Sequence, residues 1–397
     1  MLNIDIQNEV NIIFEEIVAI RRKIHQNPEL SFQEFNTTKF IQQKLDEVGI
    51  TNHTALKSPI FNSEEYIGVI GVLGQGETSI GLRADIDALP ISEETTLKFS
   101  SLNTGIMHAC GHDMHTAMLL GAAKILKKYE KSLKTRVVLI FQPAEEMLPG
   151  GAKLILESGI LDKYNIQAFF GQHINPELEL GKLAVCNGPI MASTDELHIT
   201  INGKSSHAAQ PHLGNDVILA SIEFIQYCQN LLVKFKNPLE AAVISITSIQ
   251  AGNVTNILPD TSKLLGTIRT YNQDLRNKIK SLIREHAPSI VASYGCVIDL
   301  DIVEGYPPLK NDENTTKFIK SYAAELIGEE NVIDAEPKMW AEDFAYYSQT
   351  KPSTFWFLGV TEKNQEIFPL HNPKLNPVES ALKIGTSLFV RIALDHS

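Results

Sequence analysis

Two periods of apolar residues alternate along the first 190 residues of the chain. Apolar side chains recur at the spacing of an amphipathic helix in residues 8–26, 37–48 and 116–126. Runs of β-branched and other apolar residues, typical of strands, occupy residues 66–73, 78–83, 135–141 and 168–172. Because strands alternate with helices, we predict an α/β fold with a mostly parallel sheet that helices cover on both faces.

The pattern changes near residue 191. Strand, helix, strand, strand, helix and strand are predicted at residues 195–202, 215–235, 241–249, 262–270, 275–292 and 297–304. This β-α-β-β-α-β order is the split arrangement of ferredoxin-like domains. Helix and strand then alternate again at residues 314–327, 354–360 and 380–394. We therefore expect a small α+β domain, 191–304, inserted into a discontinuous larger domain of residues 1–190 and 305–397.

The composition excludes several classes of protein. The chain has 397 residues, of which 43% are hydrophobic and 21% charged, as in ordinary globular proteins. A formal net charge of −12 argues against nucleic acid or an anionic membrane surface as a partner, and no apolar run is long enough for a membrane span. Four widely spaced cysteines and an N-terminus without a basic region indicate a reduced, cytoplasmic protein.

Metal-binding residue types are densest just before the helix at 116–126. His108, Cys110 and His112 stand at every second position, and Asp113 and His115 follow. In an extended segment alternate side chains share one face about 6–7 Å apart, so Cys110 and His112 could reach one ion. Asp113 is expected to be the helix N-cap. Thiolate and imidazole together suit zinc, and imidazole also suits nickel and cobalt. The alternative is a strand end with incidental histidines.

Other acids and histidines stand where strands are predicted to end. These residues are Asp85, Asp87, Glu145, Glu146 and His173. Ligands in α/β folds gather at the carboxyl edge of the sheet, so one coordination site accounts for all of these positions. The adjacent glutamates point in different directions, so one could bind metal while the other acts as a general base. Adjacent solvated glutamates are the alternative.

Four further residues are candidates for catalysis, substrate binding or metal binding, but a purely structural role is the alternative. His207 stands in a loop of small residues and could stabilise an oxyanion, or could be an exposed loop histidine. Asn256 and Arg269 are polar groups in apolar settings, and Arg269 could bind a carboxylate or form a structural ion pair. His371 is a candidate last metal ligand or a loop histidine. Motifs of zincin proteases, serine hydrolases and nucleotide-binding loops are absent from the sequence.

These residues together make the chain resemble the peptidase M20 family, in particular its amidohydrolase subfamily. The matching segments occur in order along nearly the whole chain, at residues 21–30, 83–90, 107–115, 141–146, 203–212, 342–344 and 370–373. The resemblance implies a zinc-exopeptidase-like catalytic domain with an inserted ferredoxin-like domain that serves as lid and dimerisation surface. It also implies a homodimer, or a tetramer, formed through that inserted domain.

The resemblance further implies two divalent metal ions per subunit, which are Zn, Mn, Co or Ni. The implied ligands are Cys110, His112, Glu146, His173 and His371. Cys110 occupies the bridging position that is an aspartate in other branches of the family. The metal role of Asp85 stays open, because other branches have a histidine ligand there.

The same resemblance assigns the remaining roles. Glu145 corresponds to the general base and Asp87 to an acid that orients a ligand. His207 would stabilise the oxyanion, often in a neighbouring subunit, and Asn256 and Arg269 would hold the substrate carboxylate.

The expected activity is hydrolysis of N-acyl amino acids to a carboxylic acid and a free amino acid. A dipeptidase or carboxypeptidase, an N-acetyldiaminopimelate deacetylase, and a catalytically silent protein that binds metal or acyl-amino acid remain as alternatives.

Overall fold

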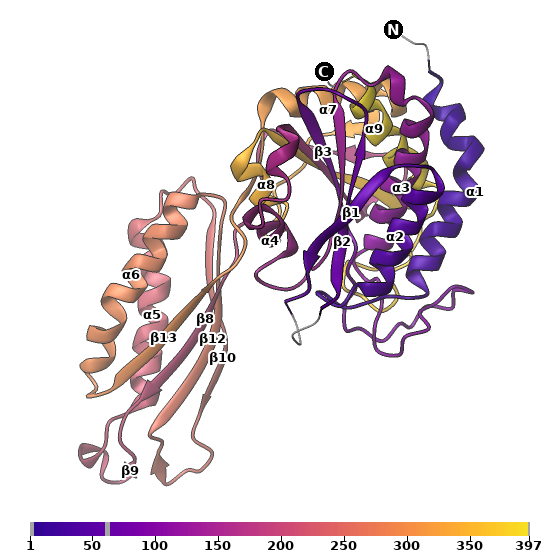
Figure 1. The fold of residues 1–397 in the computed structure, drawn as a ribbon. Coiled ribbons are helices and arrows are strands. Elements are labelled where there is room, and N and C mark those ends of the chain that lie inside the picture. Colours follow the sequence, from indigo (N-terminus) through magenta and orange to yellow (C-terminus); the bar gives the residue numbers. More distant parts are fainter. Residues whose placement is uncertain (1–3, 60–63, 396–397) are drawn as a thin grey trace. The chain divides into compact units, whose positions relative to one another are not determined.

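The computed structural model describes residues 4–59 and 64–395. The chain divides into two compact units, whose helices and strands are labelled in Figure 1. The first unit comprises the chain up to Ile190, Lys310–Glu336 and the chain from Asp343, and the second comprises Met191–Leu309 and Pro337–Glu342. The second unit begins at Met191, and the chain returns to the first unit at Lys310, five residues later than the expected residue 305.

Hydrogen bonds account for this later boundary. Arg276 donates to the carbonyl of Gly305 at 2.9 Å, and the amide of Thr194 donates to the carbonyl of Tyr306 at 2.9 Å. Residues 337–342 group with the second unit because the amide of Ala192 donates to the carbonyls of Lys338 and Trp340.

The first unit is built on an eight-stranded sheet with strand order β1-β2-β4-β3-β5-β16-β6-β15. The strands are β1 Thr51–Lys57, β2 Tyr66–Leu73, β3 Ser79–Asp85, β4 Arg136–Gln142, β5 Ile166–Glu179, β6 Leu183–Ala184, β15 Val332–Ile333 and β16 Ser353–Thr361. The central strands β4, β3, β5 and β16 are parallel to one another, and β1, β2 and β6 pair antiparallel. The predicted α/β class with a mostly parallel sheet is confirmed.

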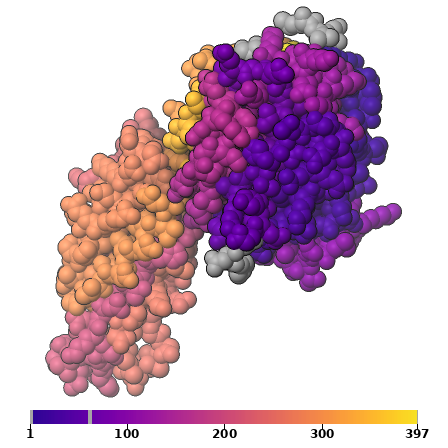
Figure 2. Space-filling model, in the orientation of Figure 1, coloured from indigo at the N-terminus to yellow at the C-terminus, as the bar shows by residue number. Residues whose placement is uncertain are grey.

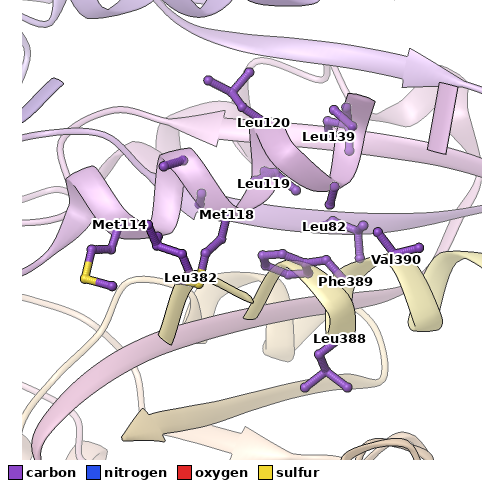
Figure 3. Packing of buried hydrophobic residues seen from close by; sticks show 14 of the residues in the cluster. Leu82, Met114, Met118, Leu119, Leu120, Leu139, Leu382, Leu388, Phe389 and Val390 are labelled. Atoms are coloured by element: carbon purple, nitrogen blue, oxygen red, sulfur yellow. The ribbon is translucent and has the colours of Figure 1, made fainter. Parts of the chain in front are cut away.

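Helices lie on both sides of this sheet. They are α1 Ile6–His25, α2 Phe35–Glu47, α3 His112–Lys128, α4 Gly151–Glu157, α7 Glu313–Ile327, α8 Ala345–Thr350 and α9 Ala381–Asp395. In Figure 1, α1, α3 and α9 lie on one side of the sheet, and α4 and α8 lie on the other. Leu82 of β3, Met118 of α3 and Phe389 of α9 belong to one buried cluster (Figure 3). This core fixes the carboxyl ends of the central strands.

The second unit has the predicted β-α-β-β-α-β order. Its elements are β8 Asp195–Asn202, α5 Val217–Phe235, β10 Ala242–Ala251, β12 Thr261–Thr270, α6 Gln273–Ala292 and β13 Val297–Glu304. The sheet is antiparallel throughout, with order β10-β12-β8-β13. Side chains of α5 and α6 pack on this sheet in a separate core that includes Phe224, Ile279 and Leu197. Side chains fill the space between the ribbons of each unit (Figure 2).

Short two-stranded pairs complete the structure. They are β7 Gly188–Met191 with β14 Leu309–Asn311, and β9 Ser206–His207 with β11 Ile257–Leu258. None of the described helices combines the length and apolar character that crossing a membrane requires.

Candidate active site

The segment before α3 contains a turn and is not the extended segment that was considered for residues 108–112. Gly111 has φ +83° and is the N-cap of α3, which begins at His112, so the prediction that Asp113 caps the helix was wrong. A Cβ at position 111 would lie 2.2 Å from Cδ1 of Ile174. Only glycine combines this backbone conformation with such a close approach to β5. The turn brings Cys110 and His112 to the same place.

All five expected metal ligands gather in the first unit, in two overlapping groups. The ligand atoms of Cys110, His112 and His173 lie within 4.8 Å of one another, and so do those of Cys110, Glu146 and His371. Cys110 belongs to both groups. Cys110, His112 and His173 are buried, the side chain of Glu146 is 12% exposed, and that of His371 is 53% exposed. Segments that are distant in the sequence therefore form a single donor cluster that is open at one side.

Two buried atoms of this cluster lack a hydrogen-bond partner within the described part of the chain. They are Nε2 of His112 and Oε1 of Glu146, the latter 3.1 Å from Nε2 of His371. Nδ1 of His112 lies 3.0 Å from the carbonyl oxygen of Asp87, so its other nitrogen faces the cluster. Buried polar atoms without partners are rare in proteins. Sulfur, imidazole and carboxylate donors of this kind fit a divalent metal ion.

Burial and neighbouring acids control protonation in the cluster. Burial raises the pKa of the Cys110 thiol well above its usual range, and the carboxylates of Glu146 and Glu145 raise it further. Burial alone favours the neutral ring of His112, but Asp85 and Asp87 raise its pKa to about 10. Both side chains therefore carry a proton at neutral pH that a bound cation would have to displace.

The sequence predicted His173 at the end of a strand, but His173 lies inside β5. Strand β5 continues to Glu179 because it pairs with β16, where His173 stands opposite Phe357. Nδ1 of His173 donates to the carbonyl of Ile174 at 2.7 Å, and Nε2 lies 3.4 Å from Sγ of Cys110. This hydrogen bond leaves Nε2 as the nitrogen that can bind a metal ion.

The adjacent glutamates Glu145 and Glu146, the acid pair, follow the end of β4. Glu145, Glu146 and His112 offer ligand atoms within 4.8 Å of one another. Glu145 is buried with 6% exposure. The backbone N–H of Glu146 donates to Oδ2 of Asp87 at 3.0 Å. Asp87 therefore contacts both His112 and the acid pair.

Asp85 is engaged by other protein groups. Nη1 of Arg83 donates to one of its oxygens at 2.6 Å, and Nδ1 of His115 lies 2.6 Å from the other. Nη2 of Arg83 also binds Asp343 at 2.8 Å. Asp85 lies 3.7 Å from Nε2 of His112. This arrangement lets Asp85 act on the cluster electrostatically.

The three expected lid residues lie in the second unit and are not all together. His207 of β9 stands opposite Ile257 of β11, and the carbonyl of Asn256 accepts the amide of Ala208, so His207 and Asn256 are neighbours. Both are exposed. Arg269 is half-buried near the other end of β12, and its Nε donates to the Thr267 hydroxyl at 3.1 Å.

The length of β12 separates Arg269 from His207 and Asn256. The β9–β11 pair lies at the Thr261 end of β12, where the amide of Gly203 donates to the carbonyl of Asp260 (Figure 1). At about 3.3 Å per residue the strand from Thr261 to Arg269 spans about 26 Å. One small molecule cannot contact both ends.

Comparison with known proteins decides the family. The model of peptidase family M20/M25/M40 matches residues 81–395. The chain belongs to this family. Every donor of the cluster lies inside the matched residues. The chain is therefore a metallo-hydrolase that acts on amide or peptide C–N bonds, and the predicted enzyme class is confirmed.

Several M20 relatives resemble almost the whole chain. N-acetyl-L-cysteine deacetylase of Bacillus subtilis is 40% identical over 389 residues, which cover 96% of this chain and 89% of that protein. Thermostable carboxypeptidase 1 of Saccharolobus solfataricus is 36% identical over 395 residues, 99% of this chain and 98% of that protein. The crystal structure of the Bacillus subtilis YXEP protein, a dinuclear metal binding peptidase from the M20 family, has a TM-score of 0.80 and 35% identity, covering 97% and 98% of the two chains.

The sequence did not identify every residue of the M20 site. His115 supports Asp85 and accepts the amide of Ile174 at 2.9 Å. Its spacing from His112, three residues along one helix, was the available signal. His108 belongs to none of the donor groups found among the described residues, although it fits the alternating pattern. It is buried, and burial lowers its pKa to about 4.

Proposed function

We propose that this M20 enzyme hydrolyses N-acyl amino acids to a carboxylic acid and a free amino acid. The observation that supports this most strongly is the donor cluster of five side chains with a further buried carboxylate, Glu145, beside it. Metal-assisted hydrolysis needs this combination of ligands and a separate base. The similarity to an N-acetyl-L-cysteine deacetylase favours an acyl-amino acid as substrate.

Cys110, His112 and His173 would hold one divalent ion, and Cys110, Glu146 and His371 a second, with Cys110 shared. The unpartnered Nε2 of His112 and Oε1 of Glu146 support this assignment. When bound, the ions would supply the Lewis acidity that polarises the amide carbonyl and activates water. Zn, Mn, Co and Ni all accept such mixed donors.

Glu145 is proposed as the general base. It would accept a proton from the attacking water and return it to the leaving amine. Asp87 would orient His112 and Glu146, since its side chain contacts Nδ1 of His112 at 3.2 Å and accepts the N–H of Glu146 at 3.0 Å. Asp85, held by Arg83 and His115, would favour the bound cations electrostatically.

His207, Asn256 and Arg269 are proposed as lid residues. His207 would donate to the oxyanion, and the other two would bind the substrate carboxylate. Because the ends of β12 are about 26 Å apart, we propose that Arg269 acts in one active site, whereas His207 and Asn256 act in the active site of a different subunit. A homodimer formed through the second unit, alone or within a tetramer, would meet this requirement.

The four cysteines, Cys110, Cys186, Cys228 and Cys296, are free thiols. This supports a reducing compartment, the cytoplasm, as the location of the enzyme.

Substitution of Glu145 and of Glu146, one at a time, tests the mechanism. Glu145→Gln should lower kcat by at least about 10³-fold while two ions per subunit remain, because a base is lost and no ligand. Glu146→Gln is the matched control and should lose bound metal as well as activity. Metal content is measured by mass spectrometry of the purified protein. Turnover by Glu145→Gln comparable to the wild type would refute the assignment.

Substrate choice needs a separate assay. Acetyl-, benzoyl- and indoleacetyl-amino acids, N-acetyldiaminopimelate and dipeptides are compared with each metal in turn. A higher kcat/KM for acyl-amino acids than for dipeptides is the expected result. The reverse order would favour the carboxypeptidase activity in the name of the Saccharolobus solfataricus relative.

A further inference from the structure

Two buried carboxyl groups hold the backbone on either side of Glu145. Oε1 of Glu34 accepts the N–H of Ala144 at 2.7 Å, and Oδ2 of Asp87 accepts the N–H of Glu146 at 3.0 Å. Ser31 donates its hydroxyl to the same oxygen of Asp87 at 2.6 Å. The loop between α1 and α2 thus contacts the residue before the acid pair through Glu34 and supports Asp87 through Ser31, although more than a hundred residues separate Glu34 from Ala144 in sequence.

Glu34 does not behave as its local position would lead one to expect. It occupies the N-cap of α2, yet its side chain makes no capping hydrogen bond, and glutamate is not among the favoured N-cap residues. The residue is fully buried, and its Oε2 has no partner within residues 4–59 and 64–395. Burial, with a contribution from Asp87, raises the pKa of Glu34 well above its usual range. A carboxyl group in this setting is costly, and helix capping does not explain it.

The peptide that Glu34 contacts is unusual. Ala144 has φ +53°, a left-handed value that residues with a side chain rarely adopt. Its carbonyl accepts the amide of Gly151 at 3.0 Å, so Ala144 is held through both its N–H and its C=O. A Cβ at Gly151 would lie 1.8 Å from the carbonyl oxygen of Pro143, so the chain turns tightly here. The bend at Ala144 determines the direction in which Glu145 leaves β4.

We propose that Glu34 is a positioning residue, which holds the Ala144 peptide so that the Glu145 carboxylate stays aimed at the reacting water. The inference rests on the proposed role of Glu145 as base. Glu34 touches neither the donor cluster nor substrate in this scheme. Small errors in the orientation of a base slow proton transfer more than they weaken binding. Loss of the acceptor should therefore lower kcat and leave KM and metal content unchanged.

The test compares three variants of the full-length, metal-loaded enzyme. Glu34→Leu removes the acceptor and Glu34→Gln keeps it. Glu130→Leu is the control, because Glu130 accepts the amide of Gly74 at 3.1 Å beside the opposite end of β4. We expect Glu34→Leu to lose at least about 30-fold in kcat, and Glu34→Gln and Glu130→Leu to stay within about threefold of the wild type. If Glu34→Leu does not fold, Glu34→Asp is tested instead. Its side chain is shorter by one methylene group, which withdraws the carboxylate from the N–H of Ala144, and the same loss in kcat is expected.

A second measurement does not depend on turnover. In metal-free protein labelled with ¹⁵N-alanine, the amide resonance of Ala144 should shift in Glu34→Leu or Glu34→Asp and stay near its wild-type position in Glu34→Gln. Unchanged kcat in Glu34→Leu, equal losses in Glu34→Gln and Glu34→Leu, or an unmoved Ala144 resonance would each overturn the inference. Glu145→Gln is assayed in parallel. If that variant is active, the proposed base is wrong; if it is inactive while Glu34→Leu is active, only the positioning role is wrong.

Discussion

At the scale of single residues, the donor cluster must lose protons before it can hold a cation. The Cys110 thiol has a raised pKa because it is buried beside Glu146 and Glu145, and Asp85 and Asp87 raise that of the buried His112 to about 10. Thiolate and neutral imidazole are the forms that bind metal. The proton therefore competes with the metal at both residues throughout the neutral range.

This competition predicts the pH dependence of metal binding. Below the two pKa values, filling the site should release about two protons, so that apparent affinity rises with pH. Titration calorimetry with Zn²⁺ in two buffers of different ionisation enthalpy counts these protons. Cys110→Ser should release about one fewer. Metal binding that released no protons would contradict the assigned ligands.

Residue type and position predicted most of the cluster. Glu146 was recognisable as a candidate because it follows a predicted strand, and Cys110 and His112 because metal-binding residue types are densest just before a predicted helix. The sequence assigned no role to His108 or His115. The contact of His115 with Asp85 depends on the packing of α3 against β3, which local alternation does not reveal. Glu34 gave no local signal, since its partner lies at residue 144.

At the scale of elements, α1 is tied to the start of α3. Nε of Arg21 donates to Asp113 at 2.7 Å and Nη1 to Glu379 at 3.1 Å, and the arginine is fully buried. His25 adds a contact to Asp113 at 2.9 Å. Because Asp113 directly follows His112, a proposed metal ligand, this ion pair also supports the first turn of α3.

Arg21 and Arg22 offer a matched comparison. Both bind Glu379 and both lie over the ring of Phe99, but the side chain of Arg22 is 48% exposed. Arg21→Met should lower the free energy of unfolding by about 3–5 kcal/mol because the buried carboxylate of Asp113 loses its permanently charged partner and keeps only His25. Arg22→Met should cost less than about 1 kcal/mol. Urea denaturation of the metal-free variants measures both, and equal losses would show that burial does not matter here.

Elements with strong local patterns were predicted closely. Strands β2, β8 and β13 have the expected bounds, since alternation and turn residues define them. The far end of β5 was missed because its extension to Glu179 depends on pairing with β16, almost two hundred residues later. Only tertiary contact supplies that information.

At the scale of the whole molecule, we propose that one complete site needs residues of two chains. His207 and Asn256 lie at one end of the second unit and Arg269 at the other, about 26 Å along β12. The predicted strand at 262–270 already separates Asn256 from Arg269, but the position of His207 depends on the register between β8 and β12, which the sequence alone could not show.

Mixed dimers test the sharing of sites. Glu145→Gln and His207→Ala should each be nearly inactive alone. Co-expressed, they should regain up to about a quarter of wild-type activity, because half of the dimers would contain one intact site. If His207 acted within its own chain, no heterodimer would hold an intact site, and activity would not rise above that of the separate variants.

The most direct test of the account is the position of the metal in a crystal of the loaded enzyme, located by anomalous diffraction. Two ions per subunit are predicted, with Sγ of Cys110 bound to both, His112 and His173 on one, and Glu146 and His371 on the other. Ions bound elsewhere, or a Cys110 that contacts neither, would contradict it.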